Sequence, residues 1–309
     1  MKTVIECREL GKRFSHVQAL NTLNLDVPER CVFGFLGPNG AGKTTAIRIM
    51  TGLLQADEGS CTVAGLAVTA RSTRHQAKIG YLAQEPKYYG WLTGRELLHM
   101  SGRMFGMSKA QASLRASELL GQTGLDHAAD RRIEGYSGGM QQRLGIAQAI
   151  MHRPEVVLLD EPVSALDPVG RREVLELIAE IAKEATVLMS THILADVERV
   201  CSHIAVMRTG RVVASGERDA LLQEYAPAQM SLTCATAEAA GALADALAHD
   251  SSALSRQDGT EVFVDLSFWE REQYTILDHV KRTGVTLVSA VPKRASLEDL
   301  FMHLMKEAV

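Results

Sequence analysis

Four short runs of nearly continuous hydrophobic residues lie along the first two thirds of the chain. They span residues 31–36, 156–159, 186–189 and 203–207. Because neither face of such a run carries polar residues, we expect buried parallel strands that are covered on both faces. Segments with helical periodicity separate these runs, and in residues 171–183 the hydrophobic side chains form one stripe. This alternation predicts an α/β domain with a parallel sheet.

Residues 91–151 show a different pattern, without any strand signal. Residues 96–105, 109–121 and 140–152 have helical periodicity instead. We therefore expect a helical subdomain that is inserted into the α/β core.

The composition changes again near Tyr225, and the pattern beyond it is typical of a smaller domain. The segments there predict, in order, a strand, a helix, two strands, a helix, a strand and a final helix. They are residues 230–234, 237–249, two short strands around Asp258-Gly259, 270–281, 285–290 and 297–307. This order predicts a ferredoxin-like α+β fold. We assign residues 1–225 to the first domain and residues 226–309 to the second.

Composition and charge narrow the function classes only slightly. The 309 residues carry a net charge of −4 and have a pI near 6.2, which argues against a broad nucleic-acid-binding surface. The five cysteines have no regular spacing, so we expect reduced, packed thiols rather than disulfides or metal ligands. No hydrophobic run approaches the roughly 18 residues of a membrane-spanning helix.

The most informative motif is the glycine-rich segment 37–45, Gly-Pro-Asn-Gly-Ala-Gly-Lys-Thr-Thr. It follows a predicted strand and precedes a predicted helix, which is the context that a phosphate-binding loop requires. The hydrophobic face of this helix is expected to comprise Ile47, Met50 and Leu54. Lys43 would reach the β- and γ-phosphates of a nucleotide, and Thr44 would bind Mg²⁺. We therefore predict binding of a nucleoside triphosphate; the alternative is an incidental glycine-rich turn.

Hydrolysis of a nucleotide also needs a metal ligand and a residue that activates water. The hydrophobic run 156–159 ends in Asp160 and Glu161, at the edge where α/β sheets place their ligands. Asp160 would hold Mg²⁺, and Glu161 would act as the general base. The alternative is a strand that ends in acidic residues at a turn.

Three further positions have both a functional and a structural interpretation. Ser137-Gly138-Gly139 precedes a predicted helix, where the free N–H groups bind anions, although an ordinary helix cap has the same pattern. One nucleotide does not need two such sites, so this segment indicates a second subunit. His192 follows the strand predicted at residues 186–189 and could reach the γ-phosphate, or it could be a surface or capping residue. Gln84 follows a short predicted strand, residues 79–82, where a glutamine is normally a loop residue.

The order of these motifs resembles the nucleotide-binding subunit of an ATP-binding-cassette (ABC) transporter over about residues 1–220. The motifs are residues 37–45, Gln84, Ser137-Gly138-Gly139, Asp160-Glu161, Ser164-Ala165-Leu166-Asp167 and His192. The resemblance implies the P-loop NTPase fold of this family, with ATP and Mg²⁺ as cofactors. It also implies that two such domains stack head to tail, with each ATP between the phosphate loop of one and the Ser-Gly-Gly segment of the other.

The resemblance assigns a role to each matching residue. The phosphates would be held by Asn39, Gly40, Gly42, Lys43, Thr44 and Thr45. Mg²⁺ would lie among Thr44, Gln84 and Asp160. The catalytic residues would be Glu161 as the base, His192 beside the γ-phosphate and water, Lys43 and Gln84.

The remaining residues would contact adenine or the second subunit. Ser137, Gly138 and Gly139 would complete the ATP site of the partner, and Asp167 would contact that partner. Phe14 takes the place of the aromatic residue that stacks on adenine, although a core phenylalanine is the alternative.

The chain departs from the family pattern at three positions. Tyr136 and Met140 replace the Leu and Gln that usually flank the Ser-Gly-Gly segment, and Val163 stands where Thr is common. None of these changes removes Glu161 or Lys43, so we expect competent hydrolysis.

The final segment, Leu297-Glu298-Asp299-Leu300-Phe301, resembles the ending of subunits that pair with ABC-2-type exporter permeases. This implies export of a drug, antibiotic, lipid or polysaccharide through a separate membrane permease. The chain would then lie in the cytoplasm, bound through the permease to the inner face of the membrane. The alternatives are an importer subunit with a regulatory C-terminal domain, or a soluble ABC ATPase without a transport role.

Overall fold

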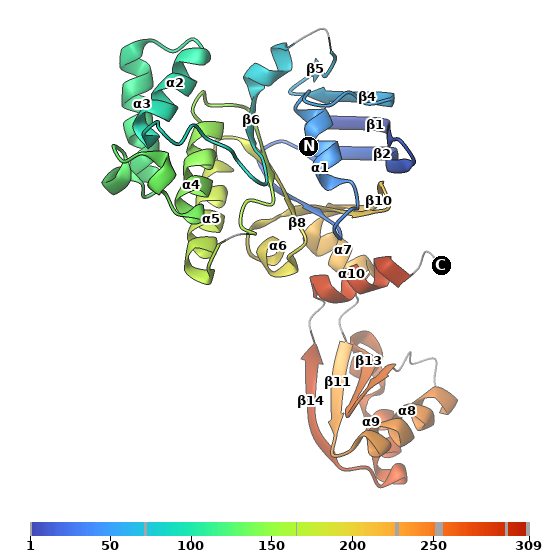
Figure 1. The fold of residues 1–309 in the computed structure, drawn as a ribbon. Coiled ribbons are helices and arrows are strands. Elements are labelled where there is room, and N and C mark those ends of the chain that lie inside the picture. Colours follow the sequence, from blue (N-terminus) through green and yellow to red (C-terminus); the bar gives the residue numbers. More distant parts are fainter. Residues whose placement is uncertain are drawn as a thin grey trace. The chain divides into compact units, whose positions relative to one another are not determined.

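The computed structural model describes residues 2–70, 73–164, 166–225, 229–250, 256–293 and 296–306. These residues form two compact units, Met1–Arg218 and Asp219–Val309 (Figure 1). The division lies close to α7 (Arg218–Tyr225), earlier than the predicted boundary after Tyr225. Residues 226–228, which adjoin that predicted boundary, lie outside the described residues.

A six-stranded sheet with the order β10-β9-β3-β8-β7-β6 forms the centre of the first unit. Its strands are β3 (Val32–Leu36), β6 (Ile79–Leu82), β7 (Val156–Asp160), β8 (Thr186–Thr191), β9 (His203–Arg208) and β10 (Arg211–Glu217). The neighbours from β9 to β6 are parallel, and only β10 is antiparallel to its neighbour β9. Every residue of β3, β7 and β8 is buried, which explains the uninterrupted hydrophobic runs. The predicted α/β core is confirmed.

A second, antiparallel sheet with the order β2-β1-β4-β5 was not predicted. Its strands are β1 (Thr3–Phe14), β2 (Val17–Pro28), β4 (Glu58–Val63) and β5 (Leu66–Ala67). Irregular pairing of β1 with β2, with register shifts around Cys7 and Leu10, disrupts the simple alternation that would reveal such strands. The sheet shares one hydrophobic core with β3 and α1 (Lys43–Met50).

The helix α1 is shorter than its hydrophobic pattern suggested. It ends at Met50, and Gly52 follows with a left-handed φ of 75°. Leu54 therefore lies beyond the helix rather than on its predicted face, although it still packs against the same core.

The predicted helical subdomain is present as α2 (Gly94–Met104), α3 (Lys109–Gln122) and α4 (Gly138–Ala149). These three helices lie together at one side of the first unit, away from the antiparallel sheet (Figure 1). Thr93 and Ser108 begin α2 and α3 with capping boxes, in which side chain and backbone bond reciprocally. The remaining helices of this unit are α5 (Pro168–Ile181), α6 (Leu194–Val200) and the short η1 (Arg74–Lys78), η2 (Asp126–Ala128) and η3 (Ile133–Gly135).

Beyond α7, which was not predicted, the second unit has the predicted element order, and its antiparallel sheet has the order β12-β13-β11-β14. Its elements are β11 (Gln229–Cys234), α8 (Ala237–Asp250), β12 (Arg256–Asp258), β13 (Glu261–Asp265), α9 (Leu266–Thr283), β14 (Leu287–Lys293) and α10 (Leu297–Lys306). This strand order is that of a ferredoxin-like fold. Leu232 and Val262 of the sheet pack against Leu243 of α8 and Ile276 of α9.

All five cysteines are buried free thiols, as expected. Among the described helices, none is both long and hydrophobic enough to span a membrane.

Candidate functional site

The glycine-rich segment connects β3 to α1 at the edge of the parallel sheet. Gly42 caps α1 with a φ of 106°, and a Cβ there would lie 2.5 Å from the carbonyl oxygen of Ala19. At Gly37 a Cβ would lie 2.7 Å from the carbonyl oxygen of Met207. Both positions thus require glycine, while Asn39 and Gly40 are exposed at the tip of the loop. The first-turn N–H groups of α1 are arranged as a phosphate site requires.

Lys43 points back over this loop. Its ammonium donates to the carbonyl oxygens of Gly37 at 2.6 Å and Pro38 at 3.2 Å. It also lies 3.7 Å from Glu161 Oε1, and the Lys43 side chain is only 6% exposed. Burial lowers the pKa of Lys43 from its ordinary value of 10.5, and the negative charges of Glu161 and Asp160 partly offset this effect. The loop and the acidic pair are therefore one site.

Asp160 ends β7 and is 1% exposed. Its Oδ1 atom accepts hydrogen bonds from Ser190 Oγ at 2.6 Å and Thr44 Oγ1 at 3.2 Å. Its Oδ2 atom is buried without a partner in the described residues. A buried carboxylate oxygen without a donor, beside a threonine hydroxyl, fits a hard cation such as Mg²⁺, which prefers oxygen ligands.

Glu161 has a strained backbone with a φ of 51° and a side chain that is 7% exposed. Its carboxylate lies 2.9 and 3.1 Å from Nδ1 of His192, so an N–H at Nδ1 donates to it. Its peptide N–H donates to Ser190 Oγ at 2.9 Å. Left-handed backbone in a non-glycine residue costs about 1–3 kcal/mol and is characteristic of functional sites. The carboxylate of Glu161 lies between Lys43 and His192.

Ser190 is a site residue that the sequence analysis missed. It is fully buried, opposite Asp160 in the parallel pair β7–β8. Its single hydroxyl joins the Asp160 side chain to the Glu161 backbone. The polar ending of the run 186–191, Ser190-Thr191, is the signal that could have found it.

The Ser-Gly-Gly segment lies at the start of α4, in the helical subdomain. Ser137 caps the helix by accepting from the Met140 N–H at 3.3 Å, and both Ser137 and Gly138 are exposed. The side chain of Tyr136 is buried, and its hydroxyl donates to Ala128 O at 2.7 Å. The replacement of Leu by Tyr therefore anchors this segment to the subdomain. No hydrogen bond within the described residues joins Ser137 to the phosphate loop.

The other predicted residues lie around this centre. Gln84 is exposed directly after β6, the neighbour of β7 in the sheet. Asp167 caps α5 by accepting from the Gly170 N–H at 3.0 Å; Ala165, nearby in the same motif, lies outside the described residues. Phe14 is 46% exposed at the end of β1, so it is not a core residue, and Lys12 Nζ lies 5.6 Å from its ring. Thr45 is half-buried on α1.

Comparison with known proteins shows the family to which the chain belongs. The family model described as "ABC transporter" matches residues 20–164. The chain is 37% identical over 305 residues to the daunorubicin resistance ATP-binding protein DrrA2 of Streptomyces coeruleorubidus, which covers 97% of this chain and 94% of that protein. The chain belongs to the ATP-binding proteins of ABC transporters. The resemblance made from the motifs is confirmed.

Another resistance protein is similar over nearly the whole chain, and solved structures are similar over about 70% of it. The linearmycin resistance ATP-binding protein LnrL of Bacillus subtilis is 29% identical, covering 97% of this chain and 98% of that protein. A solved ATP-binding subunit of an ABC transporter matches with a TM-score of 0.66 and 29% identity, covering 72% of this chain and 93% of that chain. A dimeric ATP-binding cassette in a post-hydrolysis state with ADP and Pi matches with a TM-score of 0.64 and 25% identity, covering 69% of this chain and 98% of that chain.

This ABC protein is an ATPase. The phosphate loop with its buried lysine, the acidic pair and the histidine come from three neighbouring segments, after β3, at the end of β7 and after β8. Phosphoryl transfer to water needs a phosphate cradle, a positive charge and a base, and these residues have the chemistry for each role.

Proposed function

We propose that this protein is the ATP-hydrolysing subunit of an exporter and drives a separate ABC-2-type membrane permease. The observation that carries the proposal is its similarity to resistance ATP-binding proteins along the entire chain. The similarity to the DrrA2 and LnrL proteins extends over 97% of this chain, so it includes the C-terminal unit as well as the ATPase unit. The ending Leu297-Glu298-Asp299-Leu300-Phe301, which forms the start of α10, supports the same pairing.

In the proposed catalytic cycle, Mg²⁺ would be held by Thr44, Asp160 and Gln84 and would supply electrostatic stabilisation of the phosphate oxygens. Glu161 takes a proton from the attacking water, and His192 holds the Glu161 carboxylate in position. Lys43 exchanges its bonds to Gly37 and Pro38 for bonds to phosphate oxygens. The phosphates are held by Asn39, Gly40, Gly42, Lys43, Thr44 and Thr45.

The complete site requires a second nucleotide-binding subunit. Ser137 and Gly138 are exposed at the N-terminus of α4 and have no hydrogen bond to the phosphate loop in the described residues. We infer that Ser137, Gly138 and Gly139 bind the nucleotide of a partner subunit, and that Asp167 contacts that partner. Phe14, exposed at the end of β1, stacks on adenine.

The permease has a candidate docking surface beside α2. A hollow of 350 Å³ is lined by residues that include Leu53, Tyr81, Phe105 and His152. Leu53, which lines it, is 62% exposed, and Met104, the chain neighbour of the lining residue Phe105, is 79% exposed. Exposed hydrophobic groups in a contiguous region indicate a protein interface, and a helix of the permease fits a hollow of this kind. Such docking would hold the chain on the inner face of the membrane.

The test is co-expression with an ABC-2-type permease in a drug-sensitive host, followed by transport assays in inverted membrane vesicles. ATP-dependent uptake of drug into inverted vesicles is the expected result, since that direction corresponds to export from the cell. ATP-dependent transport in the opposite direction would favour the importer alternative. ATPase activity that no permease stimulates, with no transport in either direction, would contradict the proposal.

A further inference from the structure

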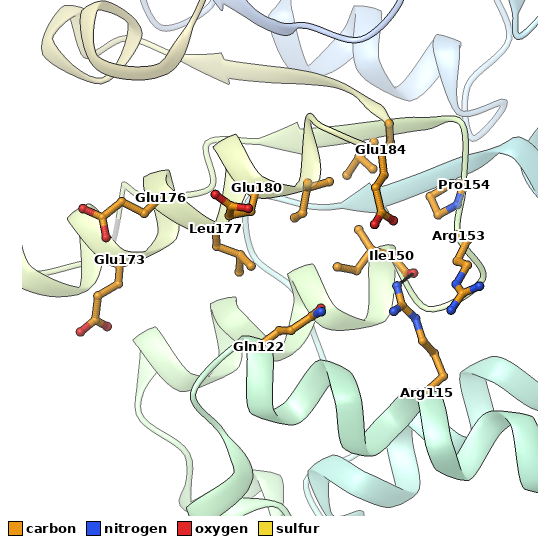
Figure 2. Close-up of a pocket in the computed structure, with 13 residues that line it drawn as sticks. Arg115, Gln122, Ile150, Arg153, Pro154, Glu173, Glu176, Leu177, Glu180 and Glu184 are labelled. Carbon is orange, nitrogen blue, oxygen red and sulfur yellow. Dashed lines mark hydrogen bonds between the residues drawn. The ribbon is translucent and has the colours of Figure 1, made fainter.

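A large groove lies beside α5, and it contains none of the residues assigned above to the ATP site. Its volume is 780 Å³, within the range of small-molecule sites. The floor is hydrophobic and includes Ile150, Leu177 and Ile181. Its rim is charged, with Arg115 and Arg153 on one wall and Glu180 and Glu184 of the α5 side on the other (Figure 2).

The charges on the two walls do not neutralise one another. Glu173, Glu176 and Glu180 form ion pairs with other residues, whereas Glu184 has none within the described residues. Arg153 is exposed and also has no ion pair there. Arg115 pairs with Glu118 at 3.2 Å and donates to Ile150 O at 3.4 Å, and its Nε–H is buried without a partner in the described residues. The groove therefore offers donors on one wall and a free carboxylate on the other.

A second hollow of 390 Å³ meets the groove at the two arginines, since Arg115 and Arg153 line both spaces. It is mostly hydrophobic near Phe105, Met107, Leu114 and Met151. Leu114 is 66% exposed there, which leaves hydrophobic surface for a ligand to cover.

The three features occur in a fixed order along the surface: a hydrophobic hollow, two arginines, and a groove with a free glutamate. An amphiphile with a hydrophobic chain, a phosphate and then an ammonium group has the same order. We propose that this surface binds a monomeric zwitterionic phospho-amphiphile of the phosphocholine or phosphoethanolamine class. The chain lies in the hollow, the phosphate accepts from Arg115 and Arg153, and the ammonium group faces Glu184.

The test is calorimetric titration of the full-length protein with dodecylphosphocholine below its micelle concentration. We expect saturable binding that weakens about tenfold or more in both Arg153→Gln and Glu184→Gln, because each loses one charge-assisted contact. The two side chains are exposed, so neither change is expected to prevent folding. Glu217→Gln, an exposed change on β10, is the matched control and should bind like the wild type.

Three analogues test the order of the groups. Dodecyl phosphate has no ammonium group, so Glu184→Gln should not change the affinity for it. Dodecyltrimethylammonium has no phosphate, so Arg153→Gln should not change the affinity for it. Phosphatidylcholine vesicles should not bind the protein, since the proposal requires the chain to leave the bilayer. Equal affinity of both variants and wild type for dodecylphosphocholine would overturn the proposal. Co-sedimentation with vesicles in place of monomer binding would overturn it as well.

Discussion

At the scale of single residues, the candidate site at the end of β7 and β8 depends on one uncharged hydroxyl group. Ser190 bonds both to the Asp160 carboxylate and to the Glu161 N–H, so it fixes Asp160, the proposed metal ligand, relative to Glu161, the proposed base. The charged residues of the site could be predicted because their motifs are specific. Ser190 could not, because its role arises only when β7 and β8 become neighbours in the sheet and bring it opposite Asp160.

We predict that Ser190→Ala lowers ATP turnover and raises the Mg²⁺ concentration needed for half-maximal activity. The change leaves the Glu161 N–H buried and unpaired, which costs about 1–3 kcal/mol. Steady-state ATPase assays across a Mg²⁺ titration measure both effects. A variant with wild-type turnover and wild-type Mg²⁺ dependence would show that Ser190 does not position the site.

His152 gives a second prediction at this scale. Its ring stacks on Phe105 at 3.7 Å, its Nε2 lies 3.1 Å from Ile79 O, and its Nδ1 is buried with no partner among the described residues. Burial lowers the pKa of His152 below its ordinary value of 6.5. The unfolded chain therefore binds a proton at His152 more readily than the folded chain does. The stability that neutral His152 contributes to the fold is lost as the pH falls below 6.5.

We therefore expect the free energy of unfolding to fall less steeply in His152→Gln than in the wild type between about pH 7 and pH 5. Urea titrations at several pH values measure this slope. Parallel profiles for the two proteins would rule out a titration of His152 in this range.

At the scale of elements, α5 and α6 are joined by a partly buried ion pair. Arg171 Nε lies 2.6 Å from Asp196 Oδ1, and the Asp196 side chain is 3% exposed. Both helices lead to the catalytic edge, since α5 begins beside Asp167 and α6 follows His192. The ion pair therefore stabilises the relative positions of Asp167 and His192.

We predict that Arg171→Met destabilises the fold by about 1–3 kcal/mol, because it leaves a buried carboxylate without its partner. The estimate is below that for a fully buried pair, since Arg171 is 29% exposed. Arg172→Met, next to it, removes an exposed pair with Glu176 and should change stability little. Equal losses for the two variants in chemical denaturation would contradict this account.

The strands of the first unit show where prediction from the sequence succeeded and where it failed. The buried strands β3, β7 and β8 have a simple signal, because a strand covered on both faces is hydrophobic throughout. The strands β1 and β2 have one partly exposed face and irregular pairing. They therefore show neither a continuous hydrophobic run nor a regular alternation that would identify them. The order of strands in the sheets also depends on long-range pairing that a hydrophobic pattern does not contain.

At the scale of the whole molecule, the proposed transporter requires contacts that the chain makes with others. Met104 is the last residue of α2 and is 79% exposed, next to Phe105, which lines the hollow assigned to the permease. We predict that Met104→Asp leaves the basal ATPase activity unchanged and abolishes its stimulation by the permease, because a charge cannot be buried there without a partner. Co-purification and ATPase assays with the permease in detergent measure both. Undiminished stimulation would place the interface elsewhere.

The central claim is that Glu161 is the base of an ATPase whose sites form between two subunits. The decisive measurement compares wild type and Glu161→Gln for ATP hydrolysis, together with their mass in solution with Mg·ATP. We predict that the variant binds ATP, forms a stable dimer and hydrolyses at least about 100-fold more slowly, since it retains the phosphate contacts and lacks the base. Turnover close to that of the wild type, or a variant that binds ATP and stays monomeric, would contradict the account.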